Sequence, residues 1–187
     1  MNARDGILGR IRKANAHRPR GNGVAPHPIP AIARGSRNDL VARFIARAES
    51  VGATVERVPS YVRGGMDDAY VVGESPGPLT AQHKVAITPV IAGIAETGSL
   101  LVASGPRRPQ LAHFLPETHI AVLPVDRIVG SYEEGYALVR DEAARTHNGV
   151  LPRAITLITG PSRTSDIERT LQIGVHGPRR LHIILTG

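Results

Sequence analysis

Polar residues that could carry chemistry gather in two turns of this 187-residue chain. The first turn, Glu96-Thr97-Gly98, separates two apolar segments, 84–95 and 99–103. Desolvation at such a junction can tune the pKa and nucleophilicity of a carboxylate, and Gly98 permits a positive φ or a close backbone approach to a ligand. The same pattern is typical of a hairpin turn with a solvated glutamate and a threonine that caps the backbone.

The second turn, Gly160-Pro161-Ser162, precedes a helix predicted to begin at Ser165. Ser165 and Glu168 have the spacing of a capping box, and Asp166 lies in the first turn, where the helix dipole favours an acid. Backbone N–H groups near a helix start can receive a carboxylate or phosphate, and Arg163 could add a bidentate contact to such an anion. Helix capping alone would also explain the serine and the two acids.

His176 is the histidine most suggestive of function, because Gly174 and Gly177 on either side of it predict an exposed loop. A histidine there can act as acid, base or donor near neutral pH, although a structural role is also consistent with the pattern. His113 and His119 are separated by a predicted helix-to-strand break, with no third ligand evident. We therefore expect no metal site.

The elements that must position these turns follow from hydrophobic periodicity and from turn residues. Helices are expected over 4–15, 36–52, 108–115, 132–145 and 165–173, the second capped by Ser36 with Asp39 and closed by Gly52. Strands are expected over 53–58, 70–72, 99–103, 119–123, 154–159 and 181–185, and within 84–95. Strands and helices alternate from residue 99 onward, which predicts an α/β fold with an open, mainly parallel sheet flanked by helices.

The net charge of +7 is concentrated in residues 1–37, which contain eight basic residues and one acid. Residues 38–187 contain 15 of each and are neutral. The sequence thus predicts a basic N-terminal helix with a Pro-rich arm over 1–37 and a single α/β domain over 38–187. The arm could contact nucleic acid, an anionic membrane or an acidic partner, but its lack of aromatic residues disfavours nucleic acid.

Composition also restricts the chemistry and the cellular location. The chain has no Cys, so it offers no disulfide, no thiolate nucleophile and no thiolate ligand for an iron–sulfur cluster. No apolar run approaches the roughly 20 residues of a membrane span. The start of the chain lacks the apolar stretch of a secretory signal, and we expect a cytoplasmic protein.

Three sequence blocks together resemble the LUD domain of the lactate utilization protein C family. They are Ala95-Glu96-Thr97-Gly98-Ser99, the run from Gly160 to Glu168, and Gly174-Val175-His176-Gly177-Pro178. Their order and spacing also fit, and the opening Ile7-Leu8-Gly9-Arg10-Ile11-Arg12 resembles the usual start of that family. Between residues 60 and 85 the chain is shorter and richer in Gly and Pro than is usual in the family.

The resemblance implies a fold like that of the sugar-phosphate isomerases and CoA transferases. It also implies bacterial oxidation of L-lactate to pyruvate beside two partner proteins that carry iron–sulfur clusters, with no cofactor bound by this chain. The motif positions carried over are Glu96 and His176 as catalytic candidates. As ligand-binding candidates they are Thr97, Gly98, Gly160, Pro161, Ser162, Arg163, Thr164, Ser165, Asp166, Glu168 and Gly177.

Three functions are therefore open. The first is an accessory subunit of a lactate-oxidising system, in which Arg163 and N–H groups of residues 161–165 bind a small anion. The second is a CoA transferase-like enzyme that uses Glu96 as acyl acceptor, since a glutamyl nucleophile supports covalent catalysis. The third is a regulatory module that binds through the basic arm.

Overall fold

The computed structural model describes residues 3–16, 28–60, 69–72, 75, 77–105, 108–146, 148–164, 172–173 and 177–187. The helices are α1 (Ala3–Ala16), α2 (Arg37–Ser50) and α3 (Tyr132–Thr146), with short 3-10 turns η1 (Ala31–Ala33), η2 (Gln110–His113) and η3 (Val125–Arg127). The strands are β1 (Thr54–Val58), β2 (Tyr70–Val71), β3 (Val85–Pro89), β4 (Ala92–Ile94), β5 (Ser99–Ala103), β6 (Thr118–Pro124), β7 (Ile128–Val129), β8 (Ile155–Ile158), β9 (Arg163–Thr164), β10 (Gln172–Ile173) and β11 (Arg180–Thr186).

Most of these strands form two sheets. The larger, called sheet 1 here, has the order β1-β11-β6-β3-β2, and each neighbouring pair is parallel. Sheet 2 has the order β7-β4-β5-β8; β5 is antiparallel to both of its neighbours. The predicted α/β fold with a mainly parallel sheet is confirmed. Sheet 2 is mixed: β4 and β5 are the antiparallel hairpin that the pattern of the Glu96-Thr97-Gly98 turn also allowed, β4 and β7 are parallel, and the antiparallel pairing of β8 was not indicated by the sequence pattern.

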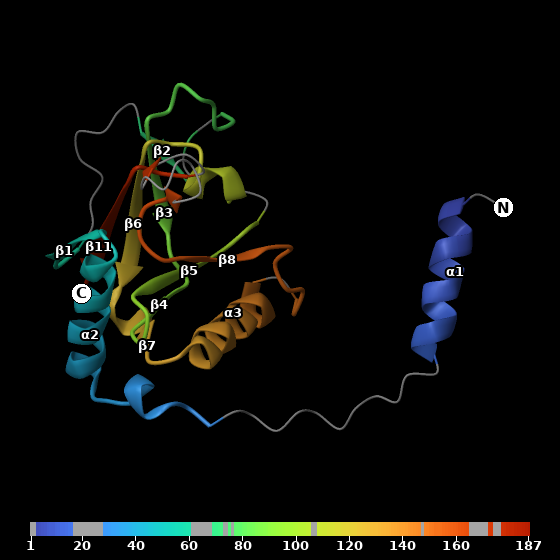
Figure 1. Ribbon diagram of the computed structural model, residues 1–187, viewed down its shortest axis with the longest axis horizontal. Helices are drawn as coiled ribbons and strands as arrows, with labels where there is room; N and C mark the ends of the chain where they lie inside the picture. Colours follow the sequence, from blue (N-terminus) through green and yellow to red (C-terminus); the bar gives the residue numbers. More distant parts are fainter. Residues whose placement is uncertain are drawn as a thin grey trace.

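The core lies between the two sheets and helix α2. Leu100 and Val102 of β5 belong to the same buried cluster as Leu123 of β6, Ile183 of β11 and Phe44 of α2. The alternate residues of β5, which point the other way because side chains alternate along a strand, pack with α3 instead. All five residues of β5 are therefore buried. Sheet 2, which contains β5, lies between sheet 1 and α3 (Figure 1).

Helix α2 begins as its local sequence dictates. The Ser36 hydroxyl accepts from the backbone N–H of Asp39, and the Asp39 carboxylate accepts from the Ser36 backbone N–H at 3.0 Å. This reciprocal capping box satisfies two N–H groups that have no partner within the helix. The same contacts with Ser36 hold the pKa of the Asp39 carboxyl below its usual value.

Helix α1 stands apart from the α/β body (Figure 1). Its large apolar residues remain exposed, with Ile7 at 51%, Ile11 at 50% and Leu8 at 37% of full exposure. The helix predicted over 4–15 is confirmed over Ala3–Ala16.

Two helix predictions are wrong in part. Residues 108–115 form only the short η2 turn, because Pro109 and Pro116 bracket a segment too short to support an α-helix on its own. The helix predicted over 165–173 does not reach its expected end, since Gln172–Ile173 is a strand paired with Arg163–Thr164. Residues 165–171 lie outside the described part of the chain.

Candidate functional site

The Glu96-Thr97-Gly98 turn joins β4 to β5 and is fixed on both sides. The backbone N–H of Glu96 donates to the carbonyl of Gly130 at 3.1 Å, and that of Gly98 donates to Ile94 at 2.8 Å. Gly98 has a φ of +70° and faces the end of α2, where an added Cβ would lie 2.4 Å from the backbone nitrogen of Ala48. The predicted need for glycine in this turn is therefore explained by both conformation and close approach.

Four hydroxyl groups meet beside this turn, and we call them the hydroxyl cluster: Thr97, Ser99, Tyr132 and Thr159. The Ser99 hydroxyl lies 2.8 Å from that of Thr97 and 2.6 Å from that of Thr159. Tyr132, the first residue of α3, donates to the Thr97 hydroxyl at 3.0 Å. Ser99 is fully buried, whereas Thr159 is exposed, so the cluster runs from the interior to the surface.

The second predicted turn is adjacent because β5 and β8 are antiparallel neighbours. The pair Leu100 and Ile158 is in register, which places Ser99 beside Thr159 and brings Gly160 to the same end of sheet 2. A Cβ on Gly160 would lie 2.6 Å from the carbonyl oxygen of Val51, which follows α2. Both turns therefore rest on the C-terminal end of α2.

The third sequence block, through Gly177 and Pro178, contacts the second turn at Ser162. The backbone N–H of Ser162 donates to the carbonyl of Pro178 at 2.9 Å. A Cβ on Gly177 would lie 3.2 Å from the Cβ of Ser162. The structure thus brings together parts of all three blocks that are far apart in the sequence.

Arg163 has a structural partner at this site. Its Nη2 donates to the carbonyl oxygen of Val51 at 2.6 Å. A guanidinium there satisfies a free carbonyl group and complements the negative end of the α2 dipole. The contact between Arg163 and an anion stays a prediction. Such a contact would use the other N–H groups of the guanidinium.

The predicted site residues divide into those the structure places and those outside its described part. Thr97, Gly98, Gly160, Ser162, Arg163 and Gly177 lie around the hydroxyl cluster and the end of α2. Glu96 is half-buried in the first turn, and Pro161 is half-buried in the second. Thr164 is described only as part of β9, and Ser165, Asp166, Glu168 and His176 lie outside the described residues.

Sequence reasoning missed Tyr132 and Thr159 as members of the site. Thr159 could have been found, since it directly precedes Gly160 at a predicted strand end. Tyr132 gives no local signal, because it joins the cluster only through the packing of α3 against β4. Together the four hydroxyls can donate to and accept from a small polar ligand such as a hydroxy acid.

A second buried polar group lies under η2. The His119 Nε2 is 2.6 Å from the Thr88 hydroxyl, and the ring centroids of His113 and His119 are 5.2 Å apart. Burial lowers the pKa of His113 to about 4, and burial with the neighbouring His113 lowers that of His119 to about 3. Both rings are therefore neutral near pH 7.

Two further observations concern only the described part of the chain. No group of three or more His, Cys, Asp or Glu side chains gathers there as a metal site would require. None of the helices described is long and apolar enough to cross a bilayer.

Comparison with known proteins identifies the family. Residues 79–186 match the LUD domain model. The chain is similar to lactate utilization protein C of Geobacillus kaustophilus, with 35% identity over 94 residues, which are 50% of this chain and 38% of the relative. It is also similar to lactate utilization protein C of Bacillus subtilis, with 37% identity over 105 residues, which are 56% of this chain and 42% of that protein. The matches thus cover about two fifths of these relatives' own length.

A solved structure supports the fold. A DUF162 family protein from Deinococcus radiodurans superposes with a TM-score of 0.59 and 22% identity, over 82% of this chain and 100% of that one. At that identity the likeness concerns the fold alone. The domain match, in contrast, extends over more than half of the sequence. The protein therefore belongs to the LUD domain family.

Proposed function

We propose that this protein acts in the cytoplasm in bacterial L-lactate utilization, as a component that binds the small carboxylate and holds no iron–sulfur cluster. The names of its relatives in Geobacillus and Bacillus support the lactate role. The chain contains no Cys to ligate a cluster. The electrons of lactate oxidation would then pass to iron–sulfur partner proteins.

The single observation that carries the proposal is the convergence of the three sequence blocks on the hydroxyl cluster. L-Lactate and pyruvate each carry a carboxylate beside one further oxygen. The exposed hydroxyl of Thr159 can donate to the carboxylate, while the half-buried hydroxyl of Tyr132 bonds with the cluster behind it. Arg163, the first residue of β9 directly after this turn, supplies the positive charge nearby. Charge-assisted bonds of this kind contribute about 1.5–3 kcal/mol each.

Calorimetry of the whole chain with L-lactate tests the site. We expect Thr159→Val to weaken L-lactate binding at least fivefold, because the methyl group keeps the shape and removes the donor. Thr156→Val is the matched control, since Thr156 lies on β8, the strand that Thr159 follows, and its hydroxyl accepts from Gln110 instead. Equal affinity of wild type and Thr159→Val would contradict the site. A mass added by acyl-CoA to a peptide that contains Glu96 would favour the CoA transferase-like alternative.

Partner proteins are tested separately. Tagged protein purified gently from its own cells should co-elute with Cys-rich proteins and show the broad visible absorbance of iron–sulfur clusters. Purification after deletion of residues 1–27, which keeps the Ser36 cap of α2, would show whether the N-terminal basic segment makes that contact. A colourless protein that elutes alone at every salt concentration would contradict the partner proposal.

A further inference from the structure

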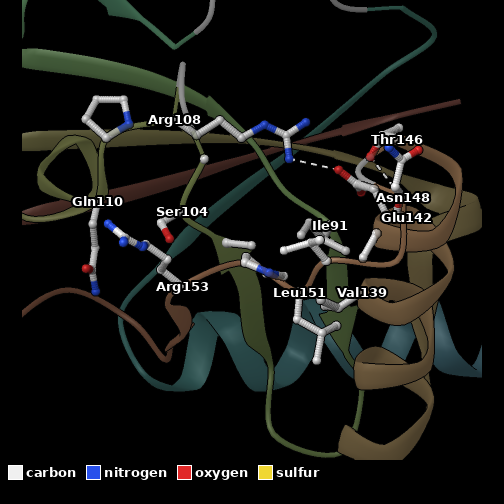
Figure 2. A pocket seen from close by; sticks show the side chains of 16 residues that line it. Ile91, Ser104, Arg108, Gln110, Val139, Glu142, Thr146, Asn148, Leu151 and Arg153 are labelled. Carbon is white, nitrogen blue, oxygen red and sulfur yellow. Dashed lines mark hydrogen bonds and ion pairs between the residues drawn. The ribbon is translucent and has the colours of Figure 1, made fainter.

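A cavity of about 970 Å³ opens at the other end of β5 from the hydroxyl cluster (Figure 2). β5 has five residues, and at ~3.3 Å per residue the two ends are roughly 13 Å apart. The walls come from the end of β5, the segment after it, the C-terminal half of α3 and the 148–153 loop. This volume lies within the range of about 300–1,000 Å³ typical of small-molecule sites.

One part of the cavity is apolar. Ile91 and Val139 form a buried surface, with exposed fractions of 5% and 2%. Leu151, which is 53% exposed, lies close to both of them in Figure 2. A leucine this exposed at the mouth of a cavity leaves apolar surface that a ligand can cover.

The other part is polar and positively charged. The Arg108 Nη1 and the Glu142 Oε1 are 2.9 Å apart, so this ion pair is neutral overall and spans one side of the cavity. Arg153 lies beside Ser104 and Gln110 on the other side (Figure 2). Within the described part of the chain Arg153 has no ion pair, which leaves one uncompensated guanidinium at the cavity.

The loop that carries Leu151 and Arg153 is anchored at both ends. After α3, the backbone N–H of Gly149 donates to the carbonyl of Ala143 at 3.0 Å. Before β8, the backbone N–H of Ala154 donates to the Ser104 hydroxyl at 3.0 Å, and Ser104 returns a backbone bond to Ala154 at 2.9 Å. The cavity is thus formed before any ligand binds, which lowers the entropy cost of binding.

We infer that this cavity is a second ligand site, for a monocarboxylate that carries an apolar chain or ring. The carboxylate would accept two N–H bonds from the Arg153 guanidinium and further bonds from Ser104 and Gln110. The apolar group would cover Ile91, Val139 and Leu151. L-Lactate, with three carbons and a hydroxyl group, would leave this apolar surface uncovered, so the ligand class differs from that of the hydroxyl cluster.

Calorimetry of the whole chain with octanoate at pH 7 tests this inference. We expect octanoate to bind with at least tenfold higher affinity than 1-octanol, which has the same chain length without the charge. Arg153→Gln should weaken octanoate binding about tenfold or more, and Leu151→Asp should weaken it by placing a charge on the apolar side. Both side chains are exposed, so neither change should impair folding.

The matched control is Arg140→Gln, which removes the same charge from the exposed Arg140 of α3, a residue that does not line the cavity. It should leave octanoate binding unchanged. Thr159→Val should also leave it unchanged, and Arg153→Gln should retain L-lactate binding, so the two sites can fail independently. Equal affinity for octanoate and octanol, or no loss in Arg153→Gln, would overturn the inference.

Discussion

The same three elements, β5, β8 and α3, build two very different regions at their opposite ends. At one end the two turns beside the hydroxyl cluster pack against the C-terminal end of α2, and uncharged hydroxyl side chains bond to one another. At the other end the 148–153 loop leaves a cavity with arginines at its edge. The comparison shows that what covers the end of a sheet, rather than the sheet itself, decides which chemistry the end can support.

Lowering the pH should cause the largest loss of folding stability, and the histidines responsible lie near the cavity end. η2 carries Gln110, which lines the cavity, and His113, which packs on His119 in the core. Because the folded pKa values, about 4 and about 3, lie below the usual 6.5, the unfolded chain binds more protons than the folded chain below pH 6.5. Their stabilisation is complete above pH 6.5 and is lost as the pH falls towards 4.

Urea unfolding at pH 7 and pH 4.5 measures this loss. Between the usual pKa of about 6.5 and pH 4.5, each histidine takes up a proton in the unfolded chain but stays mostly neutral in the folded chain. For the two histidines together, we expect the free energy of unfolding to fall by on the order of 5 kcal/mol. The double variant His113→Gln/His119→Gln should be less stable at pH 7 and should show a flatter pH profile. An unchanged slope in that variant would assign acid sensitivity to other groups.

The next largest effect is expected from glycine substitutions, which should destabilise the two ends of β5 by different amounts. Gly98→Ala forces a side chain into left-handed backbone and against α2, and we expect a loss of about 3–4 kcal/mol. Gly149→Ala, at the cavity end, has a φ of +79° but nothing within 4 Å of the added Cβ, so the loss should be only about 1 kcal/mol. Chemical denaturation compares them, and equal losses would show that close packing against α2 is unimportant.

Arg163→Gln should lower the free energy of unfolding by a smaller amount. Removing the guanidinium leaves the Val51 carbonyl without this donor and weakens the C-terminal end of α2, at a cost of about 1 kcal/mol. Arg179→Gln is the control, since Arg179 is an exposed arginine of the same region. If both variants were equally stable, the bond from Arg163 to Val51 would contribute nothing measurable.

Deleting residues 1–27 should have the smallest effect of all. Because α1 stands apart from the body in Figure 1, we expect the free energy of unfolding to change by less than about 0.5 kcal/mol. Octanoate affinity should also be unchanged. A larger change in either quantity would show that the N-terminal segment contacts one of the two ends.

Local sequence predicted what local interactions determine. Ser36 and Asp39 form the predicted capping box because both residues belong to one helical turn. Strand β5 matches the predicted run 99–103, and the first turn contains Gly98 where a positive φ is required. Each of these features depends on neighbours within a few residues.

Features that depend on distant residues could not be predicted in this way. Tyr132 joins Thr97 across 35 positions of sequence. The cavity exists because β8 returns antiparallel to β5, whereas alternating strands and helices favoured parallel pairing. The buried run 84–95 gave no sign that it would divide between two sheets, since all its strands are apolar.

That division has a consequence for how the molecule opens. The backbone N–H of Val90 donates to Val122 in sheet 1, and the next one, of Ile91, donates to Leu101 in sheet 2. Two consecutive amides therefore report on different sheets. If hydrogen exchange at both requires the same opening event, the sheets form one cooperative unit, and neither end of β5 can unfold while the rest of the body stays intact.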